Sequence, residues 1–381
     1  MRTESGEKKG WRIHCGRICL MNLLVGMALY MMLPFLNEIF FGCGADGILY
    51  FGLACIVGML LPGPFCNYWF DAYKRKSVCR RALWLMLLSL SLLFWLMPPL
   101  LRPLCGLSVG MAAGLFQMAL GSTLLIDLSP ADSRTLTAHV YYWFTRLALV
   151  LGPVASILLV KYIGFFWLPL LSALCMGVAL LLLQTVEVPF RTPLEPSVVS
   201  LDRFWMPRAF RLFLGLLLAM LPVGLAVSLF RVPEYFALMA VGFFCSLSFH
   251  RLLWVGRDAR REVLFGMALM VVAACLLFPG VSGSAMSLCL VAFLLSWGLG
   301  HVASRYLLLF VNVSEHCERG TAHTTYWLAW EGGLVSGLSM GYVLSSSAPS
   351  WLPVAALSAL VLSLGVFLTC IYAWLPKACR R

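Results

Sequence analysis

Four ionisable side chains lie inside otherwise apolar runs of this sequence, where they could bind charge or carry protons. Glu331, Arg305, Arg146 and His301 are each surrounded by stretches of hydrophobic residues. Charged groups at membrane depth are costly, and they are functional candidates for that reason. His301 precedes Arg305 by four residues, so the two share one face of a helix. Glu331, Arg305 and Arg146 are candidates for coupling proton or charge movement to a conformational change.

Glu331 and Arg305 are predicted to form an ion pair. Counted from the inner ends of their apolar runs, both lie roughly 10–12 Å deep, on neighbouring antiparallel helices. Two interpretations remain open: a fixed structural pair, or a pair whose breaking links protonation to movement. Arg146 has no acidic residue at its own depth, so it either extends toward the membrane surface or faces a cavity.

The rest of the sequence shows no pattern typical of catalysis or of a bound cofactor. It contains no catalytic triad, phosphate-binding loop or metal-ligand spacing. We therefore expect neither an enzyme nor a directly ATP-driven pump, and no cofactor or metal ion. Most of the 14 cysteines lie inside apolar runs, where free cysteine packs as a small hydrophobic residue.

The elements that must position these residues are membrane helices. Hydrophobic residues make up 61% of the 381 residues and charged residues 12%, and the mean hydropathy is +0.91. An ordinary soluble domain carries about twice that share of charge. The composition excludes a soluble enzyme, a nucleic-acid-binding module and a disordered protein. The apolar runs are continuous rather than alternating, which excludes an outer-membrane barrel.

Twelve apolar runs are long enough to cross a bilayer as helices, which takes about 20 residues. They cover residues 17–40, 47–66, 82–100, 104–127, 138–162, 165–186, 212–230, 233–254, 263–280, 284–311, 323–346 and 351–375. The longest polar interruption falls at mid-chain and is rich in Pro and charge. We predict an all-α integral membrane protein with an N-terminal six-helix lobe (1–186), a cytoplasmic linker (187–211) and a C-terminal six-helix lobe (212–381).

The basic residues predict which side of the membrane each loop faces. With the N-terminus inside, Arg102, Lys161 and Arg231 fall in outer segments and two more lie within helices, which leaves 23 of the 28 Lys and Arg in inner segments. Cytoplasmic loops carry the excess of basic residues in membrane proteins. We therefore expect a multi-pass protein of the plasma membrane, with both termini in the cytoplasm; the net charge of +12 reflects this bias.

The two halves of the chain resemble each other at an offset of 184 residues. Thr137-Ala138-His139-x-x-Tyr142-Trp143 recurs as Thr321-Ala322-His323-x-x-Tyr326-Trp327, at the start of the fifth run in each half. Six helices followed by six similar helices in the same orientation form a parallel repeat. This is the layout of two-lobed secondary transporters.

Short motifs stand between the runs and within the fifth one. Glu318-Arg319-Gly320-Thr321-Ala322 precedes the eleventh run, and Arg134 lies in the matching loop of the first half. Asp71, Lys74, Arg75 and Lys76 follow the second run, and Gly152-Pro153 lies in the fifth. Together these motifs resemble the signatures E-R-G-x-A, G-x-x-x-D-R/K-x-G-R/K-R/K and G-x-x-x-G-P-x-x-G-G of the major facilitator superfamily and its antiporters. The second signature is incomplete here, because both of its glycines are missing.

This resemblance implies the major facilitator fold, in which the first, fourth, seventh and tenth helices line a central cavity. Gln117 and His301 occupy equivalent positions of the repeat, in the fourth and tenth runs. The resemblance places both at or near that cavity. We expect Gln117, His301 and Arg305 to bind the substrate.

The loop motifs imply residues that control opening and closing. Asp71 lies at a cytoplasmic helix end, where it can accept hydrogen bonds from a neighbouring helix terminus and act as a structural latch. Lys74, Arg75 and Lys76 either pair with acidic groups of the facing lobe or only contact anionic lipid. Gly152-Pro153 is either a pivot or an ordinary kink of a membrane helix. Arg134 and Arg319 belong to the same gating loops.

The resulting prediction is a secondary active transporter that works by alternating access, with proton-coupled export of a lipophilic or amphipathic small molecule as the leading hypothesis. The partial antiporter signature and the aromatic-rich spans favour export, and the few charges in the expected cavity argue against a highly anionic substrate. The alternatives are proton-coupled uptake of a small polar solute (sugar, nucleoside or peptide-like) and a transporter-like receptor or scaffold. The expected partners of the monomeric chain are the lipid bilayer, a small-molecule substrate and protons, with no nucleic acid.

Overall fold

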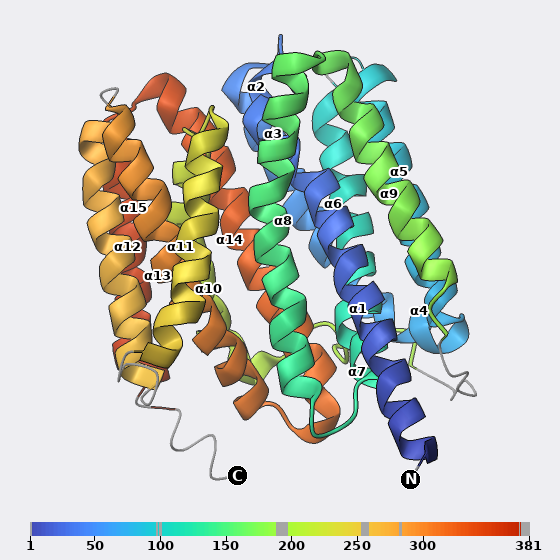
Figure 1. Cartoon of the computed structure of the whole chain (residues 1–381). Coiled ribbons are helices and arrows are strands. Elements are labelled where there is room, and N and C mark those ends of the chain that lie inside the picture. Colours follow the sequence, from blue (N-terminus) through green and yellow to red (C-terminus); the bar gives the residue numbers. More distant parts are fainter. Residues whose placement is uncertain are drawn as a thin grey trace.

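Helices make up nearly all of the described chain. The computed structural model describes residues 2–96, 98, 101–187, 197–252, 259–281, 284–372 and 374, and within these ranges it contains helices and turns but no strand. The long helices run alternately up and down the bundle (Figure 1). The first helix begins and the last one ends at the same end of the bundle, which we call the terminal end; the other is the opposite end.

The first half of the chain forms one set of helices, which we call the N-terminal bundle. Its members are α1 (Arg2–Tyr30), η1 (Leu33–Phe35), α2 (Leu36–Ile39), α3 (Gly44–Leu60), η2 (Gly63–Phe65), α4 (Cys66–Ala72), α5 (Arg75–Ser91), η3 (Leu92–Leu96), α6 (Arg102–Ala119), η5 (Leu120–Leu124), α7 (Leu125–Leu128), α8 (Arg134–Tyr162), η6 (Phe165–Trp167) and α9 (Leu168–Gln184). Within it α1 packs against α8 and α9, α3 against α6, and α5 against α6 and α9.

The second half forms the C-terminal bundle. Its members are η7 (Pro207–Ala209), α10 (Phe210–Val227), α11 (Pro233–Leu252), α12 (Ala259–Val281), α13 (Ala285–Val313), η9 (His316–Glu318), α14 (Arg319–Ser347), α15 (Trp351–Gly365) and η10 (Val366–Ile371). Here α10 packs against α14 and α15, α12 against α13 and α15, and α11 against α13. The two bundles meet mainly where α3 contacts α14 and where α8 contacts α11 (Figure 1).

Ten helical segments among the described residues are long and apolar enough to cross a membrane. The two other predicted spans correspond to α11 and α14. The described apolar part of α11, Pro233–Ser248, is shorter than the ten. α14 has 29 residues, but its sequence contains buried polar side chains such as Thr324, Thr325 and Glu331, which lower its hydropathy. Each predicted run therefore corresponds to a helix, while the count of twelve spans stays a prediction.

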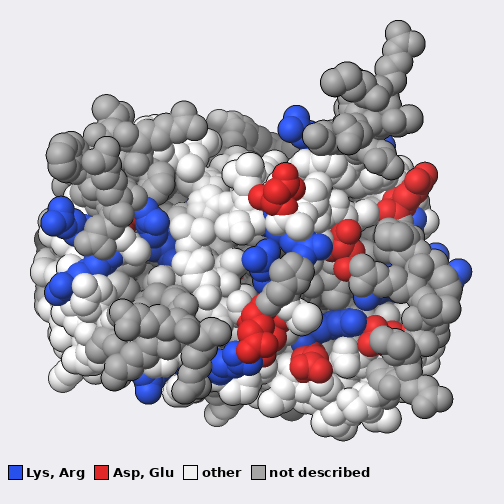
Figure 2. All heavy atoms as spheres, turned by 90° about the horizontal axis from the view of Figure 1, so that it is seen from below, with Lys and Arg blue, Asp and Glu red and all other residues white. Residues whose placement is uncertain are grey.

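The predicted linker joins the two bundles at the terminal end. Residues 188–196 of it lie outside the described ranges; residues 197–206 have no regular structure. Figure 2 shows the terminal end face-on, with basic and acidic side chains close together on it. Two of the ion pairs on this end join Arg208 to Glu315 and to Glu318, at 2.7 and 2.9 Å. The terminal end thus carries basic and acidic side chains in contact, and the side of the membrane that it faces stays a prediction.

Glycines allow α10 and α14 to approach with their backbones in contact. A Cβ atom at Gly337 would lie 2.0 Å from the carbonyl oxygen of Leu221, and one at Gly224 would lie 2.2 Å from that of Leu334. Backbone atoms cannot move aside as a flexible side chain can. Small residues at such crossings are a common means of packing membrane helices.

We expect the substitution Gly337→Ala to destabilise the protein by about 1–3 kcal/mol, the usual cost of overpacking a tight interior. The matched control is Gly177→Ala on α9, where a Cβ atom would meet nothing within 4 Å. Thermal unfolding of the two purified variants in one detergent measures the difference. Equal melting temperatures would show that the α10–α14 crossing relaxes without cost.

Candidate functional site

Contacts between the two bundles close the interface at the opposite end. The Tyr342 hydroxyl on α14 donates to the carbonyl oxygen of Leu33 at 2.8 Å. Arg231 donates to the carbonyl oxygen of Pro34 at 2.7 Å and to the Tyr342 hydroxyl at 2.9 Å. Two of these three bonds join the C-terminal half directly to the segment that follows α1.

A second set of contacts closes the interface at the terminal end. The Tyr142 hydroxyl on α8 donates to the carbonyl oxygen of His323 at 2.8 Å, and its ring meets that of Tyr326 edge-on at 4.6 Å. Gly320 lies so close to η5 that a Cβ atom there would be 2.5 Å from the carbonyl oxygen of Ser122. Contacts between the bundles therefore close both ends of the interface among the described residues.

The linker segment, residues 200–206, binds to both bundles at the terminal end. On the C-terminal side, the backbone N–H of Arg203 donates to the Thr321 hydroxyl and its carbonyl accepts from the Thr324 hydroxyl, both at 2.9 Å. On the N-terminal side, the Arg203 guanidinium pairs with Asp71 at 3.0 Å. Arg203 has a positive φ of 63°, which is uncommon for a residue other than glycine. The hydrogen bonds of α14 hold this backbone conformation in place.

Asp71 pairs with Arg203 of the linker, whereas the sequence predicted a neighbouring helix terminus as its partner; its role as a latch stays a prediction. We expect Asp71→Asn to weaken closure of the terminal end. The test is the reaction rate of a cysteine at Ser122 with a water-soluble maleimide, on a background without the native cysteines. Losing a charged hydrogen bond should raise this rate about fivefold or more. The control is Asp132→Asn, at an exposed acidic residue of the same end. Equal rates in Asp71→Asn and Asp132→Asn would contradict the latch.

A small cavity of about 70 Å³ lies between the two sets of closing contacts, and we call it the central cavity. It has room for a few water molecules. Its walls are mostly apolar, with polar groups from Asn22, Gln117, Thr145 and Glu331. The carboxylate of Glu331 accepts a short hydrogen bond from the Tyr30 hydroxyl on the other bundle. Glu331 is 8% exposed, so this carboxylate is buried at the bundle interface.

The predicted ion pair between Glu331 and Arg305 is not formed. The partner of Glu331 is Tyr30, whereas Arg305 binds the carboxylate of Glu262 on α12. The two residues have similar depth, but α14 turns Glu331 toward the N-terminal bundle, while Arg305 on α13 faces α12 within its own bundle. Depth along a helix does not determine the direction of a side chain around it.

Gln117 belongs to a polar network inside the N-terminal bundle. Its amide nitrogen donates to Asn22 Oδ1 at 2.8 Å, and its oxygen accepts from the Tyr141 hydroxyl at 2.5 Å. Asn22 in turn donates to the Thr145 hydroxyl at 2.7 Å. These bonds join α1, α6 and α8. Gln117, Asn22 and Thr145 also line the central cavity, so the network forms one polar wall of it.

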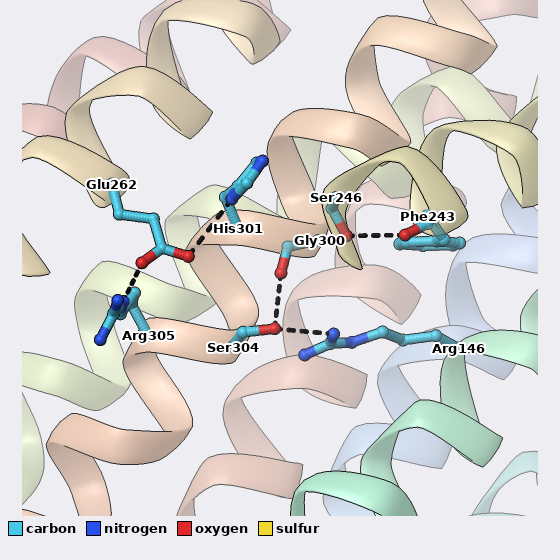
Figure 3. Close-up of polar contacts among 8 residues, drawn as sticks. All are labelled: Arg146, Phe243, Ser246, Glu262, Gly300, His301, Ser304 and Arg305. Carbon is cyan, nitrogen blue, oxygen red and sulfur yellow. Dashed lines mark hydrogen bonds and ion pairs between the residues drawn. The ribbon is translucent and has the colours of Figure 1, made fainter. Parts of the chain in front are cut away.

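Three charged or polar side chains form a buried cluster on α12 and α13 (Figure 3). Glu262 accepts from Arg305 through one oxygen, and its other oxygen lies 3.2 Å from His301 Nδ1. Glu262 is 2% exposed and His301 3%. Because a carboxylate can only accept, the Nδ1 atom of His301 must carry a proton here. The cluster is a buried, hydrogen-bonded set in which the charges of Glu262 and Arg305 compensate each other.

Arg146 reaches across the interface from α8 toward α13. Its guanidinium donates to the Ser304 hydroxyl at 2.9 Å (Figure 3). It also lies 5.0 Å from the ring centre of Trp143. Arg146 is 1% exposed. It therefore does not extend to the membrane surface. It faces the bundle interface but is not among the residues that line the central cavity or the pocket beside the Glu262 cluster.

A larger cavity of about 480 Å³ lies beside this cluster, and we call it the side cavity. Its volume is within the range typical of sites for small ligands. Residues of both bundles line it: His139 and Trp143 from α8, Ser246 from α11, Glu262 from α12, and His301, Ser304 and Arg305 from α13. His301 and Arg305 thus line the side cavity and Gln117 the central cavity. The structure does not bring the three predicted substrate-binding residues together in one cavity.

The predicted gating residues lie at helix ends and crossings. Arg75 forms an ion pair with Asp127, and Lys76 donates to the carbonyl oxygens of Gln184 and Val186 at 2.7 and 3.0 Å. Both of these contacts stay inside the N-terminal bundle, and pairing with the facing lobe stays a prediction. Lys74 lies just before the start of α5.

The remaining gating candidates belong to α8 and α14. Arg134 begins α8 and donates to the carbonyl oxygen of Ser129 at 3.3 Å, while Arg319 begins α14. Gly152 packs on α1, where a Cβ atom would lie 2.8 Å from the carbonyl oxygen of Met27, and Pro153 follows it inside α8. The Gly-Pro pair therefore allows a close crossing of α1 and α8. Its role as a pivot stays a prediction.

Several residues that contribute to these sites were not identified from the sequence. Tyr30, Asn22 and Ser304 carry no sequence signal, since hydroxyl and amide side chains are common in membrane helices. Glu262 does carry one: it lies at the inner end of an apolar run, at a depth from which it could meet Arg305. Within the described ranges, no group of three or more His, Cys, Asp and Glu side chains is arranged to hold a metal ion.

Comparison with known proteins identifies the fold. No protein-family model and no curated protein sequence matches this chain. The human organic anion transporter MFSD10 (TETRAN) has a similar structure, with a TM-score of 0.71 at 16% identity over 93% of this chain and 99% of that one. The chain has the major facilitator fold.

A bacterial homologue of the iron transporter ferroportin has the same fold. Its outward-facing structure gives a TM-score of 0.66 at 19% identity, over 97% of this chain and 100% of that one. Its inward-facing structure gives 0.62 at 18% identity, over 97% and 99%. These structures are those of transporters rather than enzymes. The shared fold and the ten apolar helices identify this chain as a multi-pass membrane protein.

Proposed function

We propose that this chain is a secondary active transporter that couples proton movement to the export of a lipophilic or amphipathic small molecule. In this proposal twelve helices cross the plasma membrane as two lobes, residues 1–186 and 212–381, joined by the linker 187–211. Both termini are cytoplasmic, because the terminal end carries most of the described basic residues. The chain works as a monomer, with the bilayer, the substrate and protons as partners and without nucleic acid.

The observation that carries this proposal is a buried carboxylate at an interface closed at both ends. Glu331 lies in the wall of the central cavity and is bonded to Tyr30 of the other bundle. A carboxylate inside a membrane is a typical proton carrier in transporters. Opening either set of closing contacts would connect Glu331 to one side of the membrane at a time. Glu331 is therefore the proposed coupling residue.

The predicted roles of the other residues are retained as proposals. His301 and Arg305 bind the substrate from the side cavity, and Gln117 binds it from the central cavity. An organic substrate agrees with the description of MFSD10 as an organic anion transporter. Breaking and remaking the pair of Asp71 and Arg203 accompanies opening at the terminal end.

The test is a transport assay with the full chain reconstituted in liposomes, with and without an imposed pH gradient. Amphipathic dyes and radiolabelled sugars, nucleosides and dipeptides are offered in turn. Dye accumulation that requires the gradient and stops with a protonophore supports export. Gradient-driven entry of a polar solute would replace export by uptake. No movement of any compound under any condition would favour a receptor or scaffold.

A further inference from the structure

Three buried nitrogen atoms near the side cavity have no hydrogen-bond partner. They are Trp143 Nε1, Arg146 Nε and His301 Nε2, and their side chains are 8%, 1% and 3% exposed. Trp143 and His301 line the cavity itself, and Arg146 lies directly behind Trp143 and Ser304. Leaving a buried donor without a partner is costly, and such groups usually have a functional reason.

The acceptor oxygens in the same wall are already used. Both oxygens of Glu262 are bound, one by His301 and one by Arg305. The hydroxyl protons of Ser304 and Ser246 go to the carbonyl oxygens of Gly300 and Phe243, both at 2.7 Å (Figure 3). Of the three unpartnered nitrogens, Trp143 Nε1 and Arg146 Nε are donors, whereas His301 Nε2 is an acceptor because the ring carries its proton on Nδ1. The two donors fit a ligand that brings acceptor oxygens.

The net charge of the wall also favours a ligand with acceptor oxygens, namely an anion. Glu262 compensates Arg305, whereas Arg146 forms no ion pair with any carboxylate of the described chain. A buried charge without a counter-ion is unfavourable. One uncompensated positive charge next to the cavity favours a ligand with a single negative charge.

The rim of the side cavity is apolar and faces outward. Leu136 on α8 is 68% exposed and Leu247 on α11 is 43% exposed, and both line the cavity. Leu136 lies in the first turn of α8, and Leu247 lies on α11. A ligand that fills this cavity therefore meets a polar wall inside and an exposed apolar rim outside.

We propose that the side cavity binds a singly charged amphipathic anion, with the anionic group at Trp143 Nε1 in the field of Arg146 and the apolar chain along Leu136 and Leu247. This inference rests on the proposed transport function, because it names the substrate class of that transporter. It also limits the class: a single carboxylate or sulfonate fits one uncompensated arginine, and a multiply charged anion does not.

The test measures binding of radiolabelled octanoate to the full chain in lipid nanodiscs, by equilibrium dialysis against empty nanodiscs. Octylamine and octanol have the same apolar chain with a positive and a neutral group. We expect saturable octanoate binding, at least tenfold tighter than that of either analogue. Trp143→Phe keeps the ring and removes the donor, so it should weaken octanoate binding about tenfold, the usual effect of losing a hydrogen bond to a charged group. Trp84→Phe, at a 57% exposed tryptophan of α5, should leave binding unchanged.

A second variant tests the charge separately. Arg146→Gln should abolish the preference for octanoate over octanol; where Arg146→Gln does not give a monodisperse protein, Arg146→Lys, which retains the charge, should retain the preference. Octanoate binding that is unchanged in Trp143→Phe, or equal binding of the three compounds, would overturn the proposal. Tight octanoate binding without transport would support the site and reject the transport function. Transport of another compound without octanoate binding would support the transport function and reject the anion site.

Discussion

Replacing Glu331 by glutamine is expected to abolish gradient-driven transport while leaving the protein folded. Glutamine has nearly the same shape and can still accept the hydrogen bond of Tyr30. It cannot take up a proton, and Glu331 is the acidic residue that lines the central cavity among the described residues. Without a titrating group the concentration ratio of substrate across the membrane should fall to about one, although exchange without a gradient can continue.

The assay for this prediction is substrate accumulation in liposomes with an imposed pH gradient, with counterflow as the gradient-free readout. Glu38→Gln is the matched control, because Glu38 is an exposed acidic residue at the opposite end. Tyr30→Phe separates the hydrogen bond from the proton: it should change the pH dependence of transport and keep accumulation. Continued accumulation by Glu331→Gln against a gradient would mean that another residue carries the proton.

Replacing Glu262 by glutamine is expected to have the largest effect on stability. Glu262 is almost fully buried and binds both Arg305 and His301. Its neutralisation removes the negative charge that pairs with Arg305. Removing one partner of a buried ion pair typically costs about 3–5 kcal/mol. Arg305→Gln should be destabilising for the converse reason, and the double variant Glu262→Gln, Arg305→Gln should recover most of the loss.

Thermal unfolding of the purified single and double variants completes this cycle. Arg208→Gln is the surface control, because Arg208 binds Glu315 and Glu318 where water screens the charges, and we expect little change in its melting temperature. If the double variant is no more stable than the two single ones, Glu262 and Arg305 do not act as a pair. The cycle also shows whether transport needs the pair, since the stabilised double variant can be assayed directly.

The helices could be predicted from the sequence because the bilayer requires long apolar runs. The predicted run 165–186, for example, contains α9 almost entirely. Breaks inside a run could not be located in the same way. The run 17–40 is interrupted after Tyr30, where η1 and α2 begin, although the residues around Pro34 are all apolar. Hydropathy reports the surroundings of a residue, not the hydrogen bonding of its backbone.

The candidate site could be predicted only in part, for a related reason. The sequence identifies Arg146, His301, Arg305 and Glu331 as unusual, because each stands in an apolar run. It does not determine which way each one points, and so it paired Arg305 with Glu331 instead of Glu262. The predicted apolar run 263–280 begins just after Glu262 and so leaves it outside the span. In the structure α12 begins earlier, at Ala259, and its first turn packs against α13.

α14 touches the N-terminal bundle at three levels along its length. His323 is bound near the terminal end, Glu331 near the middle and Tyr342 near the opposite end. Glu331 is two residues from Gly333, the midpoint of the 29-residue helix. If α14 tilts by about 10° around that point, the levels of His323 and Tyr342 move by about 2.5 Å in opposite directions, since each lies about 14 Å from it. One outer bond then breaks while the other holds. Glu331 is close to the point of rotation and stays in place, while the end of the bundle from which it can be reached changes.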